Sequence, residues 1–374
     1  MRGAALIFKL SIQPRRIEGN NFQQHSTDRT ASTSAMPELP PPININPPLI
    51  NSANPWASDY EDLERLYLCP STGAVTTRTA TLDGFKHDDA IHRYAFFDPS
   101  CHQISESTNP THQEASRAPS QTASLNTLGY SPHALIHYLK WIEKLQATYS
   151  NSHPAKPFII SVTGTPGDIM SCYSCIAEVL PEMVSAGQVY MEINLSCPNI
   201  PNKPPPAYSK VALVEYLKGL RIWMNDPNQS DLPRLPFGIK TPPYTHSSEY
   251  HELMSALEEQ GDQVSFITCT NTLGSCLVLS SEGNPVLPGN GIGGMAGAAL
   301  HPLALGNVAT IRRMLDERPS LKHITVVGIG GVEDDKGYKR MRAAGAGVIG
   351  VGTALGVKGV RVFKEIEEGL KGEW

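Results

Sequence analysis

The sequence predicts an α/β protein that folds as a (β/α)8 barrel, and three observations lead to this prediction. From residue 47 onward, short apolar runs alternate with longer segments of helical periodicity. There are eight such runs, which is the number of strands that closes a parallel barrel. Polar residues and glycines follow the ends of these runs, where barrels carry their chemistry.

The apolar runs are the predicted strands of the barrel. Most are nearly continuous in apolar character, which is typical of parallel strands that are buried on both faces. They cover residues 47–53, 73–80, 157–163, 189–195, 236–241, 264–270, 324–330 and 347–353. A doubly wound open sheet is the alternative on periodicity alone, but the number of runs favours closure.

Helices are predicted between the strands because apolar residues recur there on one helical face. In residues 132–148, Leu135, Leu139, Ile142 and Leu145 show this spacing. The same spacing predicts helices at 171–186, 209–225, 247–260, 302–316 and 334–344. The first of these holds the CxxC pair Cys172 and Cys175, whose sulfurs we expect to pack as apolar groups.

Composition excludes several functional classes. The chain has 374 residues and a net charge of −5, which argues against a general nucleic-acid or anionic-membrane surface. No run approaches the ~20 apolar residues that span a bilayer, so we expect a soluble, cytoplasmic protein. The seven cysteines are scattered and fit a reduced compartment, and no metal site is predicted.

Two segments are set apart from the barrel, which we expect to form one domain over residues 41–374. Residues 1–40 are expected to be a disordered extension; the basic start "MRGAALIFKLSIQPRR" leaves mitochondrial targeting open, and Met36 leaves open a later start. Residues 84–123 are rich in Ser, Thr, Pro and His without periodicity, which predicts an inserted surface excursion or lid.

Polar side chains at successive strand ends are the candidate functional residues. The stretch "NLSCPN" places Asn194, Cys197 and Asn199 after the fourth run, and Lys240 ends the fifth. A lysine in an apolar strand is rarely buried without a partner, so at a barrel mouth it favours an anion or a cofactor. The structural alternative for Cys197 is a buried packing thiol. Polar residues at other strand ends are Arg78, Thr79, Asn271 and Thr272.

Two glycine-rich turns follow the last two strands. Gly330 and Gly331 belong to "VVGIGG", and Gly352 precedes Thr353 in "GVGTAL". Glycines let backbone N–H groups approach an anion, and barrels often bind phosphate at this place. The turns therefore predict a phosphate-bearing ligand. A further glycine cluster at 289–302 is expected to cover a ligand or to form a flexible turn.

Six motifs in chain order resemble those of the class 1 dihydroorotate dehydrogenases. They are "EINLSCPNIPNKP", "GIKTPPY", "TNTLGS", "GIGG" with "HPLAL", "VVGIGG" and "GVGTAL". Members of this class are FMN-dependent (β/α)8 enzymes of pyrimidine biosynthesis, and the sequence looks like class 1A. The likeness covers residues 44–368 apart from 84–123. "NLSCPN" and "IKTPPY" are its specific elements, because many phosphate-binding barrels share the glycine motifs.

The resemblance implies a role for each matching residue. Cys197 would be the general base that takes a proton from C5 of dihydroorotate while a hydride leaves C6 for flavin N5. Substrate contacts would come from Arg78, Asn126, Leu128, Gly129, Asn194, Asn199, Asn271 and Thr272. FMN contacts would come from Ser52, Ala53, Asn54, Arg78, Thr79, Asn194, Lys240, Gly294, Gly330, Gly331, Gly352 and Thr353. Fumarate as electron acceptor and a homodimer follow from the same resemblance.

Two positions depart from the family pattern. Arg78 stands where the family has lysine, and a planar guanidinium is not equivalent to an ammonium at a tight site. Asn54 stands where a small glycine is expected. These departures leave open an FMN barrel with a related substrate or a weakly active paralogue. A non-redox phosphate-binding barrel would use the same glycine turns but gives no reason for Cys197.

Overall fold

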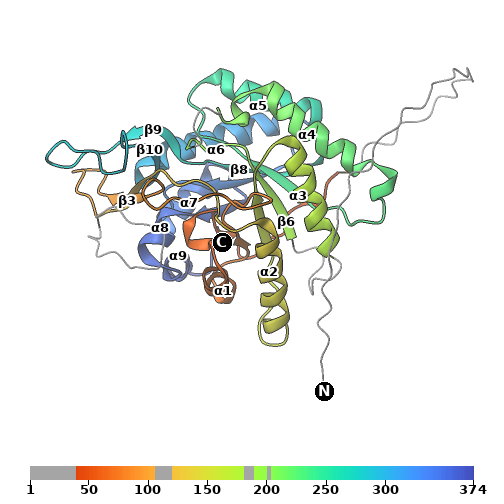
Figure 1. Cartoon of the computed structure of the whole chain (residues 1–374), viewed down its shortest axis with the longest axis horizontal. Coiled ribbons are helices and arrows are strands. Elements are labelled where there is room, and N and C mark those ends of the chain that lie inside the picture. The colour runs from red at the N-terminus through yellow and green to blue at the C-terminus, as the bar shows by residue number, and fades with distance from the viewer. Residues whose placement is uncertain (1–38, 106–119, 181–188, 200–203) are drawn as a thin grey trace, which may run out of the picture. The chain divides into compact units, whose positions relative to one another are not determined.

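A closed sheet of parallel strands forms the centre of the fold (Figure 1). The computed structural model describes residues 39–105, 120–180, 189–199 and 204–374. In these ranges, eight strands form one sheet in the order β1-β12-β11-β8-β7-β6-β5-β2. A parallel bridge from Ile50 to Ala74 joins the two ends of this order, so the sheet closes on itself. The predicted (β/α)8 barrel is confirmed.

Every barrel strand lies within one of the eight predicted apolar runs. The strands are β1 (Leu49–Asn51), β2 (Val75–Thr76), β5 (Phe158–Val162), β6 (Val189–Asn194), β7 (Phe237–Lys240), β8 (Val264–Cys269), β11 (Thr325–Ile329) and β12 (Val348–Val351). Neighbouring residues of a strand enter different cores: Ile159 and Phe266 pack inside the barrel, whereas Phe158 and Ile267 pack against the helices. Burial on both faces explains the nearly continuous apolar runs.

Helices surround the barrel strands (Figure 1). They are α1 (Tyr60–Leu68), α2 (Leu135–Tyr149), α3 (Pro166–Val179), α4 (Lys210–Met224), α5 (Ser247–Gln260), α6 (His301–Asp316), α7 (Asp335–Ala343), α8 (Thr353–Lys358) and α9 (Arg361–Leu370). Helices α2 and α4 to α7 confirm the predicted helices, whereas α1, α8 and α9 were not predicted.

Helix α3 carries the CxxC pair, and it begins earlier than predicted. The expected start was residue 171, but Thr165 and Asp168 form a capping box that begins the helix at Pro166. Cys172 is fully buried and Cys175 packs against the core, as expected for apolar sulfurs. Residues 181–186 of the predicted helix lie outside the described residues.

A second, antiparallel sheet was not predicted. It contains β3 (Tyr94–Phe97), β4 (Ala123–Asn126), β10 (Ile292–Gly297) and β9 (Leu273–Leu277), in that order. In Figure 1, β3, β9 and β10 lie together at one side of the barrel. The irregular excursion expected over 84–123 is therefore wrong for β3, all of whose residues are buried; residues 106–119 lie outside the described part.

Residues 292–297 of the glycine cluster form β10 rather than a flexible turn. Its glycines permit close contact with neighbouring strands: a Cβ on Gly293 would lie 2.5 Å from Asn126 O, and one on Gly294 would lie 2.3 Å from Thr272 Oγ1. Because glycine has a low strand propensity, the sequence alone does not predict this strand. The need for glycine becomes clear only from the positions of the neighbouring strands.

Several expectations concern residues 1–38, which are outside the described ranges. The disordered or targeting extension and the domain boundary at residue 40 stay predictions. In the ranges that the structure describes, no helix is both long and apolar enough to cross a bilayer. The same ranges contain no group of three or more His, Cys, Asp or Glu side chains arranged to hold a metal ion.

Candidate active site

A cavity opens at the carboxyl ends of the barrel strands. It brings together residues that follow β1, β2, β6, β7, β8, β11 and β12, with further residues from β3, β4 and β10. The predicted site residues that line it are Ser52, Ala53, Asn54, Arg78, Thr79, Asn126, Leu128, Gly129, Asn194, Cys197, Asn199, Lys240, Asn271, Thr272, Gly330, Gly331, Gly352 and Thr353.

Gly294 is the predicted residue that does not line the cavity. Its carbonyl accepts a hydrogen bond from Asn126 Nδ2 at 3.0 Å, and β10 pairs it with Asn126. Gly294 therefore lies behind Asn126 and supports it. The "GIGG" motif alone gave no sign of this arrangement because the pairing of β10 with β4 joins distant parts of the chain.

Cys197 is half-buried in the loop after β6, where it lines the cavity. Burial raises the pKa of its thiol, and the backbone N–H of Asn199 and the charges of Lys240 and Arg78 act in the opposite direction. The hydroxyl of Tyr130 also lowers the pKa of this thiol. A thiol faced by a donor and two cations is suited to a base that must lose its own proton.

Two buried cations face the cavity without a carboxylate partner among the described residues. Lys240 is 3% exposed, and its Nζ makes no hydrogen bond or ion pair there. Arg78 is 5% exposed and donates to Ser58 Oγ and Gly129 O, both at 3.2 Å. Burial lowers the pKa of Arg78, which is the expected sign for a desolvated cation. Unpaired buried charge is unfavourable, so this pair indicates an anionic ligand.

Amide side chains on another wall are already fixed by hydrogen bonds. Asn199 Nδ2 donates to Asn126 Oδ1 at 3.0 Å and to Leu128 O at 2.9 Å. Asn126 Oδ1 also accepts from Leu128 N at 3.2 Å. These contacts hold the two carboxamides in one arrangement before any ligand binds, which reduces the entropy lost on binding.

The glycine turns form a cradle in another part of the cavity wall. Gly331 has φ +69°, and a Cβ there would lie 2.7 Å from Gly297 O and 2.7 Å from His301 Cβ. His301 Nδ1 donates to Gly330 O at 2.6 Å, while Arg340 Nε donates to His301 Nε2 at 3.0 Å. The turn is thus held from behind by side chains, and its backbone faces the cavity.

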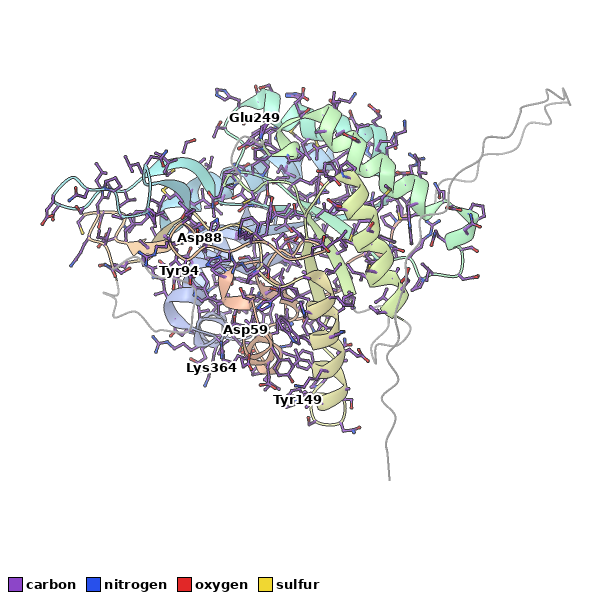
Figure 2. The ribbon with its side chains drawn as sticks, in the orientation of Figure 1. Asp59, Asp88, Tyr94, Tyr149, Glu249 and Lys364 are labelled. Carbon is purple, nitrogen blue, oxygen red and sulfur yellow. The ribbon has the colours of Figure 1, made fainter. Side chains whose placement is uncertain are left out.

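The side chain of Asn54 is hydrogen-bonded to the neighbouring backbone. Its Oδ1 accepts from Trp56 N at 2.9 Å and its Nδ2 donates to Ser52 O at 2.8 Å. The departure from the expected glycine therefore stabilises the turn after β1. Trp56 stacks on Phe96 with centroids 5.8 Å apart and meets the edge of Tyr94 at 5.5 Å, which forms an aromatic wall. Figure 2 labels Tyr94 on β3.

Several lining residues were missed in the sequence. They are Pro55, Trp56, Tyr94, Ser124, Tyr130, Thr270, Ala296, Gly297, Leu300 and Ile329. Tyr130 directly follows Gly129, so the motif that predicted Gly129 would have found it. Tyr94 had no such signal, because the antiparallel sheet brings it to the site.

Comparison with known proteins identifies the family of this chain. Residues 103–373 match the family described as "Dihydroorotate dehydrogenase". The chain is 29% identical over 325 residues to "Dihydroorotate dehydrogenase (fumarate)" of Trypanosoma cruzi, which covers 86% of this chain and 88% of the relative. It is also 29% identical over 263 residues to "Putative dihydroorotate dehydrogenase A (fumarate)" of Streptococcus pyogenes serotype M5, covering 70% and 76%.

A third relative covers a similar share of the chain. "Probable dihydroorotate dehydrogenase A (fumarate)" of Streptococcus pneumoniae serotype 4 is 27% identical over 324 residues, which cover 86% of this chain and 88% of the relative. The family match spans most of the barrel, including every strand from β5 to β12 and the loop that carries Cys197. The chain therefore belongs to the dihydroorotate dehydrogenase family of oxidoreductases.

Proposed function

We propose that this protein oxidises dihydroorotate to orotate in pyrimidine biosynthesis, with FMN as cofactor and fumarate as electron acceptor. The family is flavin-dependent in general, and the relatives' names include fumarate. The observation that carries the proposal is the position of Cys197, in one cavity with two unpaired cations and a set of fixed amides. The homodimer and the cytoplasmic location stay predictions.

The residues around the cavity fit FMN. The glycine cradle at Gly330 and Gly331 offers backbone N–H groups to a phosphate, and a Cβ at Gly331 would collide with Gly297 O and His301 Cβ and shift the turn. Lys240 supplies a positive charge that would balance an electron-rich ring. Thr270 lines the cavity, and its buried hydroxyl has no hydrogen-bond partner in the described part of the chain. These features are unfavourable unless a polar, anionic ligand completes them.

The amide side chains on another wall of the cavity fit the substrate. Dihydroorotate carries a carboxylate and a cyclic imide, whose edge alternates carbonyl oxygens and N–H groups. Carboxamides both donate and accept, so Asn126, Asn194, Asn199 and Asn271 are suited to that edge. Arg78 lies near enough to Cys197 for its charge to act on the thiol, so it would place an anionic substrate group beside the base.

Cys197 would act as the general base. Its thiolate would take the proton from C5 of the substrate, and bound FMN would supply the acceptor for the hydride that leaves C6. Lys240 and Arg78 would stabilise the thiolate before the transfer. After the transfer the neutral thiol must lose its proton again, and the Tyr130 hydroxyl is a side-chain donor that favours the thiolate.

Arg78 is the observation that favours a second candidate. Because a guanidinium is wider than the ammonium of the family's lysine, the substrate pocket beside it has a different shape and donor pattern. An FMN oxidoreductase acting on a related cyclic substrate would retain the yellow cofactor and Cys197. Assaying dihydroorotate against close analogues, in which the carboxylate or one ring nitrogen is changed, decides between the two.

Turnover with both substrates tests the proposal. Under anaerobic conditions the purified protein should convert dihydroorotate and fumarate to orotate and succinate in equal amounts. Omitting fumarate should stop orotate formation after the bound cofactor is reduced. A yellow protein that yields no orotate from dihydroorotate, with or without fumarate, would contradict the assigned substrate; a colourless protein that cannot be loaded with FMN would contradict the whole class.

The pH dependence of cofactor reduction tests the role of the thiol. Because burial raises the pKa of Cys197, the thiolate becomes populated only as the pH rises, so the rate of reduction should increase with pH. Tyr130→Phe removes an interaction that lowers this pKa, and the profile should move to higher pH. Stopped-flow absorbance measures both profiles.

A matched control for this prediction is Tyr216→Phe. Tyr216 lies in the small neighbouring cavity with Tyr130 and Cys197, but its hydroxyl donates to Gly164 O at 2.7 Å. This variant should keep the wild-type profile. A Tyr130→Phe profile that stays in place or moves to lower pH would show that the hydroxyl does not act on the base.

A further inference from the structure

A line of hydrogen bonds leads from the barrel interior to the candidate site. Ser161 Oγ on β5 donates to Glu192 Oε1 on β6 at 2.8 Å. Thr79 Oγ1 lies 2.9 Å from Ser161 Oγ, and Asn194 Nδ2 donates to Thr79 Oγ1 at 3.0 Å. All four residues are buried, but only Thr79 and Asn194 line the cavity. Glu192 and Ser161 lie behind them.

The carboxylate fixes the direction of every bond in this line. A carboxylate can only accept, so Ser161 must donate its single hydroxyl proton to Glu192. Ser161 then accepts from Thr79, which uses the single proton of Thr79. Thr79 must in turn accept from Asn194, and the only donor on that carboxamide is its nitrogen. Asn194 is therefore held with Nδ2 toward Thr79 and Oδ1 turned away.

The same direction continues to the next amide. Asn194 Oδ1 accepts from Ser196 N at 3.3 Å, from Ser196 Oγ at 2.9 Å and from Asn271 Nδ2 at 3.2 Å. Asn271 Nδ2 also donates to Ser196 Oγ at 3.0 Å, and Asn271 Oδ1 accepts from Thr272 N at 2.7 Å. Both protons of the Asn271 amide are thereby used. Asn194 retains one N–H, and Asn271 retains one oxygen lone pair.

Glu192 is unusual for a packing residue. It is 2% exposed, and it has no ion pair and no hydrogen-bond donor other than Ser161 among the described residues. A buried carboxylate with a single donor is unfavourable, and an apolar side chain would fill the same space at lower free energy. Its position is explained if its acceptor-only character is what the site requires.

We infer that Glu192 is a positioning residue which, through Ser161 and Thr79, holds Asn194 Nδ2 in place and, together with the Ser196 N–H on Oδ1, sets the donor and acceptor directions of this amide toward the substrate. This inference rests on the proposed function, in which Asn194 contacts the alternating carbonyl and N–H edge of a pyrimidine. If Asn194 turned over, its oxygen would face a substrate carbonyl and the hydrogen bond would be replaced by repulsion.

Three variants test the inference. Glu192→Gln keeps the shape but adds a donor, so Ser161 and the line beyond it lose their fixed direction. Ser161→Ala breaks the line. Ser265→Ala is the matched control, because Ser265 is also a buried serine on a barrel strand, and its hydroxyl has no partner in the described ranges. Calorimetric titration with orotate gives the affinity, absorbance gives the FMN content, and thermal unfolding reports folding.

We expect Glu192→Gln and Ser161→Ala each to weaken orotate binding about 10-fold, with FMN content unchanged. The double variant should lose about the same 10-fold rather than the product, because both changes interrupt one line. In turnover, KM should rise more than kcat falls. Ser265→Ala should bind orotate like the wild type.

Orotate affinity equal to wild type in a folded Ser161→Ala variant would overturn the inference, as would full additivity in the double variant. If Glu192→Gln does not fold, Ser161→Ala alone decides. A wild-type protein that neither binds orotate nor is reduced by dihydroorotate would instead overturn the proposed function.

Discussion

Cys197→Ala should slow reduction of the bound flavin by dihydroorotate about 100-fold or more, which is the usual contribution of a positioned base. The loss is chemical because the residue supplies the atom that accepts the C5 proton. Orotate binding should stay near the wild-type value, since the amide wall at Asn126 and Asn199 is held by its own hydrogen bonds. Anaerobic stopped-flow absorbance measures the reduction rate, and titration with orotate measures binding.

Cys276→Ala provides the control for this variant. Cys276 is also half-buried, but it lies on β9 and does not line the cavity. The flavin bound to the Cys276→Ala variant should be reduced by dihydroorotate at the wild-type rate. Unchanged reduction kinetics in Cys197→Ala would remove the thiol from the role of base, whereas loss of orotate binding would indicate a collapsed pocket instead.

Gly331→Ala should weaken FMN binding about 10- to 100-fold. Two effects add here: φ +69° is unfavourable for a residue with a Cβ, by roughly 1 kcal/mol, and that Cβ would meet Gly297 O and His301 Cβ at 2.7 Å. The turn must shift, and its N–H groups would then no longer point at the phosphate. Fluorescence titration of the apoprotein with FMN gives the dissociation constant.

Gly289→Ala separates the two effects. Gly289 has nearly the same φ, +68°, but a Cβ there would meet nothing within 4 Å. It should lose about 1 kcal/mol of stability and keep its FMN affinity. Equal FMN affinities in the Gly331→Ala and Gly289→Ala variants would show that the turn after β11 does not hold the cofactor.

The barrel was predictable because each strand carries its own signal. A strand buried on both faces must be mostly apolar, as β5 ("FIISV") and β8 ("VSFITC") are, whatever its neighbours. The functional residues at the strand ends could be predicted in the same way. A buried lysine inside an apolar run is unfavourable unless a ligand contacts it, so the residue type and position of Lys240 were enough to predict a site there.

The antiparallel sheet could not be predicted in the same way. The segment "YAFF" of β3 is too short to show a period, and the glycines of β10 are explained only by the close approach of Asn126 and Thr272. For the same reason the sequence did not reveal that Gly294 lies behind Asn126, or that Tyr94 reaches the cavity.

Glu192 shows a second kind of limit. In the run "VYMEIN" a single glutamate gives no period, and although it begins the motif "EINLSCPNIPNKP", the motif assigned it no role. Its meaning depends on Ser161 and Thr79, which belong to other strands and become neighbours only in the closed barrel. Hydrogen-bond direction is a property of that three-dimensional line and not of any one residue.

Anaerobic titration of the purified protein with dihydroorotate, followed at the visible absorbance of the flavin, tests the central claim most directly. The account predicts a yellow protein whose colour bleaches in proportion to the dihydroorotate added and returns when fumarate is supplied. A yellow protein that keeps its colour in excess dihydroorotate would contradict the account.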